Sequence, residues 1–323
     1  MRVIVTGGSG FIGSVLIDQL ASLNYNCLNL DISRPRNSAH SSYYFNCNIL
    51  DSKLLCDVFQ GFQPDYVYHL AARTDLDGSS MDDYACNTNG TFNIIQACKC
   101  FSPRKLLFTS TQLVCPVAFA PSNEYDVCPP NFYGRSKLLA ESYLRLFASD
   151  FAWTIARPTS VWGPWFGLMY QGLFRTILSG RYRHVSGVRL IKRWAYVENA
   201  VHSLIRMAES ISTNRSTFYV ADREPYVLSD FAESICRLSG SPTIGALPLP
   251  AFRALARFGD LLKNFNIDFP LHSYRLSNIL SNMEISTDFL PPSLITDVVP
   301  RDTAILRTLD WMIDYNSDGL ASN

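Results

Sequence analysis

Short runs of β-branched and other apolar residues alternate with amphipathic stretches through the first half of the chain. The apolar runs read RVIV near the amino terminus and then NCLNL, YVYHL, KLLFTS and WTIARP. The amphipathic stretches between them cover residues 11–23, 54–62, 84–100 and 133–148. A regular alternation of strand and helix is typical of an α/β protein, so we expect a Rossmann-like, doubly wound parallel sheet with helices on both faces.

The alternation stops after Gly163. Aromatic residues, proline and arginine are dense in GPWFGLMYQGLFRTILSGRYRH, and short helical patterns follow from Leu228 to the end. This change predicts a first domain of residues 1–163 and a smaller carboxyl-terminal lobe of residues 164–191 and 223–323. The segment 192–222, which contains RWAYVENAVHSLIRMAES, is expected to return to the first domain.

Composition limits the partners of the protein. The 323 residues are 47% apolar, which is ample for a core. The 28 basic residues equal the 28 acidic ones, so no global field attracts nucleic acid or an anionic membrane, and we expect neither as a partner. No apolar run approaches the ~18 residues that span a bilayer, and MRVIV reads as a strand rather than a signal peptide.

Cysteine and histidine residues give no sign of a metal site. The nine cysteines include no CxxC pair, and the five histidines lack the spacing of metal ligands. We therefore expect no bound metal. An odd number of cysteines favours reduced thiols and a cytoplasmic location.

A glycine motif, VIVTGGSGFIGSVL, joins the first strand to the first helix. Gly7, Gly10 and Gly13 lie where a side chain would obstruct the tight turn, the approach of backbone to a pyrophosphate, or the packing of helix on strand. An ordinary strand-to-helix turn can also carry three glycines. The complete context of strand, helix, second strand and terminal acid favours a dinucleotide site at the amino end of this helix.

Asp31 ends the second strand and indicates which dinucleotide binds. A carboxylate here accepts hydrogen bonds from the adenosine ribose hydroxyls and repels the 2′-phosphate of NADP. Arg34 and Arg36 follow closely and offer positive charge to such a phosphate. Because Asp31 occupies the position where the phosphate would be repelled, we expect NAD as the cofactor.

A second motif, FYGRSKLLAE, contains a candidate catalytic pair. Tyr133 and Lys137 are four residues apart on an expected helix, so both side chains emerge on one face. An ammonium beside a phenol favours the phenolate, which accepts protons near neutral pH. Taken alone, a Tyr and a Lys at this spacing are most often surface residues without a catalytic role. Downstream of a dinucleotide motif and the hydroxyl-bearing strand end FTST, it indicates catalysis.

Several motifs in order resemble one known family over nearly the whole chain. They are TGGSGFIG, Asp31, YHLAA from Tyr68, NTNGT from Asn87, FTST, YGRSK, RPTSVWGP from Arg157 and WAYVENAV from Trp194. Together they resemble the extended short-chain dehydrogenase/reductase superfamily, specifically its NAD-dependent nucleotide-sugar epimerase/dehydratase family. The resemblance implies that residues 1–163 bind NAD and that the carboxyl-terminal lobe binds the substrate.

The resemblance also implies roles for individual residues. The catalytic hydroxyl would be Thr111, bonded to a substrate oxygen and to Tyr133, while Lys137 holds the nicotinamide ribose. The cofactor would meet Gly7, Gly10, Phe11, Ile12, Gly13, Asp31, Asn48, Ile49, Leu70, Ala71, Ala72, Asn87, Ser110, Tyr133, Lys137 and Pro158. The substrate would meet Thr74, Thr111, Gln112, Ser160, Lys192 and Arg193.

The two residues after Thr111 separate the possible reactions. Dehydratases of the family carry Asp and Glu directly after this hydroxyl, whereas this chain has Gln112 and Leu113. An amide and an alkyl group cannot transfer protons, so elimination is excluded. Leu113 also stands where sugar-acid decarboxylases carry Glu and where epimerising reductases carry Cys. Epimerisation at C4 or simple oxidoreduction remains.

The substrate side departs further from the family than the cofactor side. Ser160 replaces an asparagine that meets the substrate phosphates in similar epimerases. Lys192 falls on a diphosphate-binding arginine, with Arg193 beside it, so charge is kept while the bidentate fork is lost. Asn48 replaces an Asp that touches adenine.

These observations favour an NAD-dependent nucleotide-sugar epimerase that acts at C4 through a 4-keto intermediate. The alternative is an NAD(P)-dependent reductase or dehydrogenase of a nucleotide sugar, a sterol or another carbonyl compound. A non-enzymatic dinucleotide sensor is disfavoured because Thr111, Tyr133 and Lys137 are all present. The family habit further implies a homodimer formed through two helices per subunit, and the apolar helix from Leu138 onward permits it.

Overall fold

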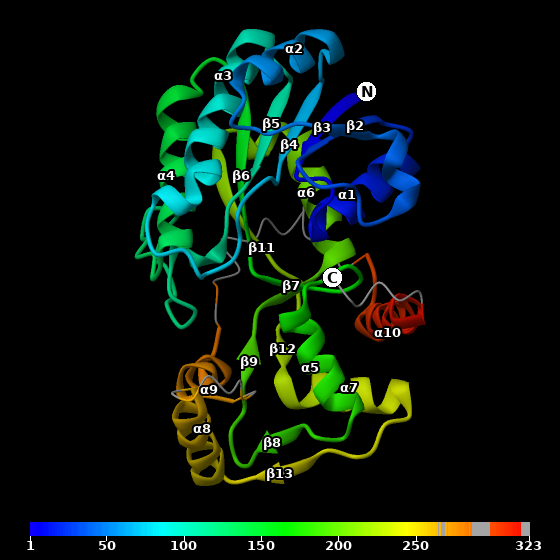
Figure 1. Ribbon diagram of the computed structural model, residues 1–323, viewed down its shortest axis with the longest axis vertical. Helices are drawn as coiled ribbons and strands as arrows, with labels where there is room; N and C mark the ends of the chain where they lie inside the picture. Colours follow the sequence, from blue (N-terminus) through cyan, green and yellow to red (C-terminus); the bar gives the residue numbers. More distant parts are fainter. Residues whose placement is uncertain (264, 266–268, 270, 284, 286–297, 318–323) are drawn as a thin grey trace.

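A seven-stranded parallel sheet forms the centre of the molecule (Figure 1). The computed structural model describes residues 1–263, 265, 269, 271–283, 285 and 298–317. From one edge to the other the sheet runs β11, β6, β5, β4, β1, β2, β3. These strands are β1 (Arg2–Thr6), β2 (Asn26–Asp31), β3 (Tyr44–Asn46), β4 (Tyr66–His69), β5 (Lys105–Thr109), β6 (Trp153–Pro158) and β11 (Ser216–Val220).

The strand order makes this a doubly wound sheet. The chain starts in the centre at β1, moves outward through β2 to β3, and then crosses back to β4 on the other side of β1. Val3 of β1 is in register with Cys27 of β2 on one side and with Tyr66 of β4 on the other. In such folds ligands bind outside the carboxyl ends of the strands where the order reverses, which here lies between β1 and β4. The α/β, Rossmann-like fold expected from the sequence is confirmed.

Helices cover both faces of the sheet (Figure 1). One face carries α2 (Ser52–Phe62), α3 (Thr91–Phe101) and α4 (Phe132–Phe147), and the other carries α1 (Phe11–Ser22) and α6 (Val197–Glu209). Successive residues of β1 serve opposite faces, because Val3 and Val5 join the core beneath α1 and α6 while Ile4 joins the core beneath α2, α3 and α4. This burial on both sides explains why the strand reads as a continuous apolar run.

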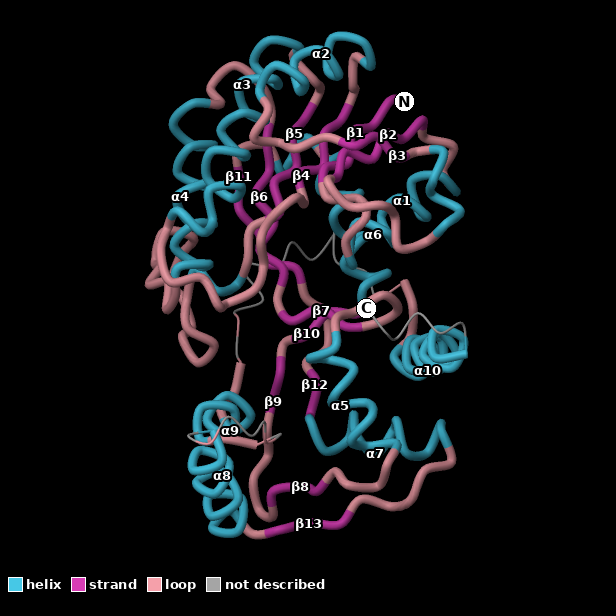
Figure 2. The backbone as a smooth tube through the Cα atoms, viewed as in Figure 1, coloured by secondary structure: helices cyan, strands magenta, loops and turns pink. Residues whose placement is uncertain are grey.

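A second group of elements lies beyond the carboxyl ends of the strands, in the lower half of Figures 1 and 2. Its helices are α5 (Leu168–Leu178), α7 (Leu228–Ser239), α8 (Leu249–Lys263), α9 (Ser273–Leu280) and α10 (Arg301–Ser317). Its short strands pair as β7 (Ser160–Trp162) with β10 (Trp194–Tyr196), β9 (Ile191–Lys192) with β12 (Tyr226–Val227), and β8 (Arg183–Val185) with β13 (Gly245–Leu247). Residues 264, 266–268, 270, 284, 286–297 and 318–323 of the expected lobe lie outside the described residues.

Short helical turns connect these elements. They are η1 (Ser38–Ser42), η2 (Asp82–Tyr84), the π-helical turn η3 (Cys86–Gly90), η4 (Gln112–Val114) and η5 (Ile211–Thr213). The turn η4 directly follows the carboxyl end of β5, and η3 lies in the connection between β4 and α3. They therefore belong to the region where a ligand is expected.

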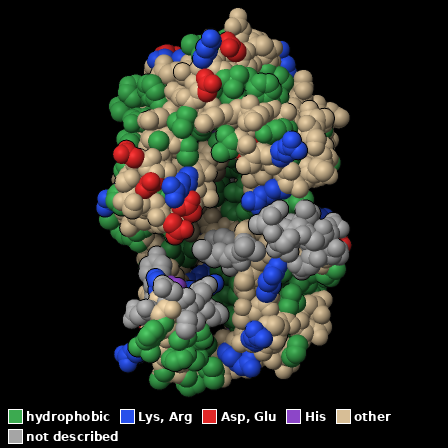
Figure 3. All heavy atoms as spheres, viewed as in Figure 1, with side chains coloured by type: hydrophobic (Ala, Val, Ile, Leu, Met, Phe, Trp, Pro, Cys, Tyr) green, Lys and Arg blue, Asp and Glu red, His purple; other side chains and the backbone are tan. Residues whose placement is uncertain are grey.

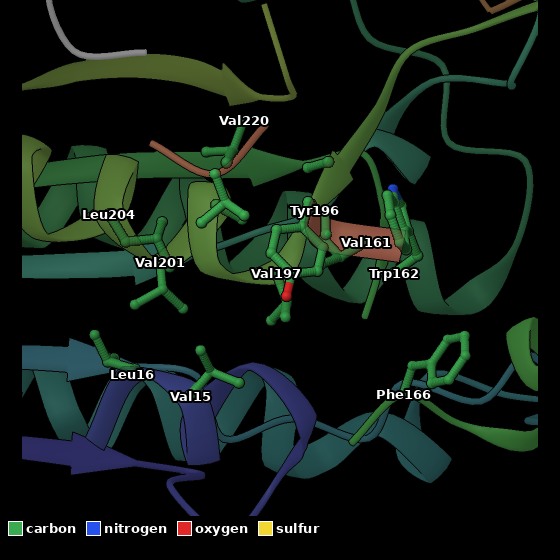
Figure 4. Close-up of a cluster of buried hydrophobic side chains, with 14 of the residues drawn as sticks. Val15, Leu16, Val161, Trp162, Phe166, Tyr196, Val197, Val201, Leu204 and Val220 are labelled. Carbon is green, nitrogen blue, oxygen red and sulfur yellow. The ribbon is translucent and has the colours of Figure 1, made fainter. Parts of the chain in front are cut away.

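One hydrophobic core runs from the sheet into the second group of elements (Figure 4). Its members include Val15 and Leu16 of α1, Val201 and Leu204 of α6, and Trp162 of β7. The segment 192–222 supplies β10 and α6 and ends as the edge strand β11 of the main sheet. Shared buried side chains, rather than a solvated linker, therefore join the two parts of the chain. The domain boundaries drawn from the sequence stay a prediction.

Candidate active site

The glycine turn between β1 and α1 leaves no room for side chains. Gly7 has a φ of +74°, and a Cβ there would lie 2.5 Å from the backbone nitrogen of Ala71, which follows β4. A Cβ on Gly13 would lie 2.2 Å from the carbonyl oxygen of Gly7. The first contact brings the ends of β1 and β4 together at the reversal of strand order, and the second holds α1 close to the turn. The loop Leu70–Ala72 thus lies beside the glycines, as the expected cofactor site requires.

The amino terminus of α1 is suited to a pyrophosphate. Gly10 precedes the helix, and among the described residues no side chain caps the first turn, which begins with Phe11, Ile12 and Gly13. Uncapped amide groups and the helix dipole attract an anion. The glycines keep the approach to these amides free, so the residues present fit a dinucleotide.

Asp31 lies at the end of β2, beside the glycine turn. Its carboxylate accepts hydrogen bonds from the backbone N–H groups of Ser9, at 3.0 Å, and Ser33, at 2.9 Å. These bonds orient the side chain, while each oxygen retains a lone pair for a ribose hydroxyl. Arg36 donates to the backbone oxygen of Trp165 at 2.8 Å, so its charge is directed to the loop before α5 rather than to the ribose. The arrangement fits the unphosphorylated ribose of NAD.

Asn48 and Ile49 follow β3, at the expected adenine end of the site. The side-chain oxygen of Asn48 accepts a hydrogen bond from the N–H of Leu50 at 3.0 Å, within its own turn. Ile49 is buried, and a Cβ on Gly90 would lie 2.5 Å from its Cδ1. The turn after β3 therefore packs closely against η3. The contact of Asn48 and Ile49 with adenine stays a prediction.

Thr111, Tyr133 and Lys137 gather where β5 ends and α4 begins. All three are buried, with 7%, 8% and 2% of their surface exposed. Oγ1 of Thr111 accepts a hydrogen bond from the N–H of Leu113 at 3.1 Å. The hydroxyl hydrogen of Thr111 is therefore available to another acceptor, such as a substrate oxygen.

A close backbone contact holds α4 against the turn after Thr111. A Cβ on Gly134 would lie 2.1 Å from the backbone oxygen of Leu113. The side chain of Asn131 caps α4 by accepting a hydrogen bond from the N–H of Gly134 at 2.8 Å. Both contacts fix the first turn of α4, and therefore the ring of Tyr133, relative to the strand end that carries Thr111.

Lys137 lies deeper in the same site, one helical turn after Tyr133. Its ammonium is 4.5 Å from the centre of the Phe108 ring. Burial lowers the pKa of Lys137 to about 8, and the carboxylate of Glu141 opposes this shift. At neutral pH the side chain is therefore a buried cation one helical turn from Tyr133.

A buried ion pair lies behind the catalytic residues. Arg157 donates two hydrogen bonds to Glu141, from Nε at 2.9 Å and from Nη2 at 2.7 Å. Ser110 donates a third, at 2.5 Å. The sequence assigns Ser110 to the cofactor, whereas here its hydroxyl ties the end of β5 to α4. Reasoning from the sequence did not single out Glu141, although it lies one helical turn after Lys137 in YGRSKLLAE.

The loop after β4 carries Arg73 and the exposed Thr74. Arg73 pairs with Asp75 through hydrogen bonds of 2.8 and 2.9 Å, and its guanidinium lies 5.1 Å from the centre of the Tyr84 ring. That ring is 6.2 Å from the ring of Tyr133. Reasoning from the sequence did not single out Arg73 either, because its contacts with Asp75 and Tyr84 depend on how the loop folds.

Asn87 braces this loop from the π-helical turn η3. Its Oδ1 accepts a hydrogen bond from the N–H of Arg73 at 2.8 Å. Its Nδ2 donates to the backbone oxygen of Arg73 at 3.0 Å and to Oγ of Ser136 at 2.9 Å. The residue that the sequence assigns to the cofactor therefore also ties the loop after β4 to α4. Local π-helix often marks a functional site.

Gln112 and Ser160 lie side by side beyond the carboxyl ends of β5 and β6. Nε2 of Gln112 is 3.4 Å from Oγ of Ser160. Pro158 ends β6 and Ser160 begins β7, so this contact crosses the carboxyl ends of β5 and β6. The structure therefore groups two expected substrate residues and one expected cofactor residue.

Lys192 and Arg193 bond to backbone oxygens in the second group of elements. Lys192 is 4% exposed, and its ammonium donates to the backbone oxygens of Asn278, at 3.0 Å, and Ser281, at the carboxyl end of α9. Burial lowers the pKa of Lys192 to about 8. Arg193 donates to the backbone oxygen of Arg223 at 2.7 Å. Contact of either cation with a substrate diphosphate stays a prediction.

The surface is hollowed between the sheet and the second group of elements, with Lys and Arg side chains beside the hollow (Figure 3). Within the described residues, no cluster of three or more His, Cys, Asp or Glu side chains is placed to hold a metal ion. In that part of the chain, no helix combines the length and apolar character needed to cross a membrane.

The site defines a class of protein. It combines a glycine turn at the reversal point of a doubly wound sheet, an acid at the end of the second strand, a Thr after the fifth strand, and Tyr and Lys side chains on helix α4. These are the parts of a dinucleotide-dependent enzyme that moves a hydride and a proton. Comparison with known proteins gives the family: residues 3–221 match the model of the NAD dependent epimerase/dehydratase family, to which the chain belongs.

Relatives and solved structures agree with this family. A probable dTDP-glucose 4,6-dehydratase of Sinorhizobium fredii is 25% identical over 346 residues, covering 97% of this chain and 93% of that protein. A UDP-glucose 4-epimerase of Mycolicibacterium smegmatis is 31% identical over 180 residues, covering 51% and 57% of the two chains. The crystal structure of a UDP-glucose 4-epimerase of Thermotoga maritima shares the fold, with a TM-score of 0.75 at 18% identity over 98% and 100% of the chains. The family resemblance, an enzyme of the extended short-chain dehydrogenase type and NAD as its cofactor are thereby confirmed.

Proposed function

We propose that this chain is an NAD-dependent nucleotide-sugar epimerase that inverts C4 of a hexose through a 4-keto intermediate. The observation that carries the proposal is the turn η4, which follows Thr111 and presents Gln112 and Leu113 next to the catalytic hydroxyl. Neither side chain transfers protons, whereas Tyr133 and Lys137 supply the groups that oxidation and reduction at a carbinol need. Family membership and the M. smegmatis epimerase support the same conclusion.

Thr111 and Tyr133 act on the C4 oxygen. The hydroxyl of Thr111 binds this oxygen, and the phenolate of Tyr133 takes its proton as the C4–H bond breaks. NAD supplies the acceptor, and later the donor, of the hydride. Lys137 stabilises the phenolate by positive charge. The sugar turns, C4 regains hydride on its other face, and Tyr133 returns the proton, so the cycle consumes no cofactor.

Loss of water from the sugar needs catalysts that η4 does not offer. Elimination next to a ketone removes a carbon-bound proton and protonates the departing hydroxyl. Gln112 and Leu113 do neither. The reaction for which the S. fredii relative is named therefore lacks its acid and base in this turn.

The substrate is held mainly by its nucleotide end, which leaves the sugar free to turn. Ser160 and the cations Lys192 and Arg193 face the phosphates in this proposal. For Lys192, phosphate oxygens then replace the backbone oxygens of Asn278 and Ser281 at its ammonium. A charged ligand thus exchanges one set of oxygen acceptors for another, and the buried cation is never left unpaired.

We also propose a cytoplasmic homodimer with a role in carbohydrate biosynthesis. Phe92 of α3 lies edge-on to Tyr143 and Phe147 of α4, with ring centres 5.8 and 5.6 Å apart. Leu146 is 71% exposed on the same helix. An apolar surface on two adjacent helices fits a second copy of the chain. The nine free cysteines support a reducing compartment.

The test is to incubate the purified protein with UDP-, GDP- and dTDP-hexoses, without added reductant, and to follow C4 configuration by NMR. We expect interconversion without a change in the near-ultraviolet absorbance of reduced NAD. Lasting accumulation of reduced cofactor, or activity only with added reductant, would assign the chain to the dehydrogenases or reductases. Ile211→Ser, at a position 84% exposed on η5, is the matched surface control.

A further inference from the structure

Helix α8 turns an apolar face to the solvent. Leu255, Phe258 and Leu261 are 40%, 52% and 55% exposed, and Phe265, in the turn after the helix, is 69% exposed. Their spacing of three to four residues places them on one side of the helix. Hydrophobic side chains gather at the lower left of Figure 3, where Figure 1 places α8. A surface helix of a globular protein normally presents the opposite face.

The other side of α8 is fixed against the rest of the chain. Ala256 and Gly259 are buried there. A Cβ on Gly259 would lie 1.9 Å from the backbone oxygen of Leu271 and 2.9 Å from Cδ1 of Phe269. This close approach uses the smallest residues of the helix as its packing face. The larger apolar side chains therefore cannot rotate inward without losing that contact.

Two arginines border the apolar face of α8. Arg253 and Arg257 are exposed, four residues apart, and Arg257 lies one helical turn before Leu261; Lys263 ends the helix. The acid of α8, Asp260, accepts hydrogen bonds from the N–H and the hydroxyl of Ser273, so its charge is directed toward α9. A net charge of zero over the whole chain conceals this local excess.

We propose that this face of α8 binds the surface of an anionic lipid bilayer. Phenylalanine and leucine on one side, with arginine and lysine at its edge, are the features of a helix that lies in the membrane interface rather than spans it. The apolar side chains enter the boundary between head groups and acyl chains, while Arg253, Arg257 and Lys263 meet the anionic head groups. The docking surface is separate from the residues assigned to catalysis, so it goes beyond the proposed epimerase.

A second copy of the chain fits this surface poorly. A two-fold contact places the same patch on both sides of the interface. The paired faces would bring the arginines of one α8 toward those of the other, while Asp260 is already bonded to Ser273. Like charges at such an interface oppose association, whereas an anionic bilayer neutralises them.

Vesicle co-sedimentation of the full chain tests the proposal. We expect wild-type protein to sediment with phosphatidylcholine vesicles that contain about one-third phosphatidylglycerol, and much less with phosphatidylcholine alone. Arg253→Gln with Arg257→Gln should lower partitioning to the anionic vesicles about thirtyfold, at about 1 kcal/mol for each cation. Leu255→Ser with Leu261→Ser should lower it at least tenfold on both vesicles.

Controls separate lipid binding from misfolding. Ile211→Ser removes a more exposed apolar side chain, at the far end of the sheet domain, and should leave sedimentation unchanged. Thermal unfolding and NAD binding of each variant verify the fold. Wild-type protein that sediments no better with anionic than with neutral vesicles overturns the proposal. Unchanged sedimentation of the Leu255→Ser, Leu261→Ser variant also overturns it. The same holds if the wild-type protein forms a dimer without vesicles and this double variant does not.

Discussion

Tyr133 is buried at the start of α4, with its ring 6.2 Å from that of Tyr84. Tyr133→Phe keeps the ring and its packing but removes the oxygen that, in the proposed function, takes the C4 proton. We expect turnover to fall by roughly 10²–10⁴-fold, while the dissociation constant for NAD changes little. NMR of the sugar measures turnover, and calorimetric titration measures NAD binding. Retention of a tenth of the activity would mean that another group is the base.

Lys137 links catalysis to stability through its pKa. Burial lowers this pKa from 10.5 to about 8. Below pH 8 both folded and unfolded chains carry the charge, and the folded state bears the full cost of burying it; above about 10.5 neither state is charged and the cost is gone. Lys137→Met should therefore raise the free energy of unfolding of the cofactor-free protein by about 1–3 kcal/mol at pH 7. Urea unfolding should show this gain shrinking as the pH rises from 8 to 10.5.

Lys105 is the matched control for Lys137. Burial also lowers its pKa to about 8, but its ammonium donates to the backbone oxygen of Met207 and to Oγ1 of Thr213, away from the site. Lys105→Met should leave turnover intact and destabilise the protein, because those oxygens lose their donor. Lys137→Met should remove turnover and weaken NAD binding. A fall in stability in both variants would contradict the account given for Lys137.

We predict that Asp31 sets the choice between NAD and NADP. Asp31→Ala removes the ribose acceptor and the repulsion of a 2′-phosphate, so discrimination against NADP should fall by about 1–3 kcal/mol. Arg36→Ala is the comparison, since Arg36 bonds to Trp165 and its loss should leave the preference unchanged. Titrations with both dinucleotides decide the matter. Wild-type protein that binds NADP more tightly than NAD would refute this role of Asp31.

The residues found from the sequence are those whose chemistry is set by local spacing. Tyr133 and Lys137 are one helical turn apart, and Gly7 lies in a turn that its own neighbours define. The contact of Arg36 with the backbone oxygen of Trp165 depends instead on how distant segments meet, and no spacing in the sequence reports it. Arg36 was noticed in the sequence, but this contact across the fold was therefore missed.

Among the elements, α4 depends on a glycine for its position. Gly134→Ala places a Cβ against the backbone oxygen of Leu113, and neither can move without shifting the helix or the turn. We expect a loss of about 1–3 kcal/mol in the free energy of unfolding and a fall in turnover. Gly61→Ala, in α2, is the comparison, because a Cβ on Gly61 would have no atom within 4 Å. This substitution should be neutral or stabilise the protein by up to about 1 kcal/mol. Equal effects of the two substitutions in denaturant unfolding would mean that the contact is unimportant.

The strands of the main sheet were predictable because each is a buried apolar run between turns. The pairs β7–β10, β9–β12 and β8–β13 were not, since strands of two or three residues have no detectable period and form only where the chain brings them together. The sequence predicts short helices in this region but does not say which side of α8 is buried. The close packing of Gly259 on Leu271 and the exposure of Phe258 show that its larger apolar side chains face solvent.

At the scale of the whole molecule, the sequence predicts two parts but not how firmly they are joined. The alternation of strand and helix depends on local pattern, so the first part was predictable. The core that runs through α1, α6 and β7 joins residues more than a hundred positions apart, such as Leu16 and Trp162. The sheet and the second group of elements should therefore unfold together.

Association of two subunits is tested on the outer face of α4. Leu146→Asp adds a charge at the centre of the proposed dimer interface, where its desolvation opposes association. We expect a shift from dimer to monomer in light scattering after size-exclusion chromatography. Leu23→Asp, at a position 55% exposed after α1 on the opposite face of the sheet, is the control and should leave the dimer intact. A monomeric wild-type protein would remove the homodimer from the proposal.

The turn η4 has a consequence for how this protein changes over evolution. Its backbone makes the structural contacts, through the N–H of Leu113 to Thr111 and the oxygen of Leu113 toward Gly134. The side chains of Gln112 and Leu113 are only partly buried and belong to neither main core cluster. Selection can therefore exchange them at little cost to folding. Under the proposed function the outcome of the reaction depends on these two side chains, so one lineage can move between chemistries without rebuilding its fold.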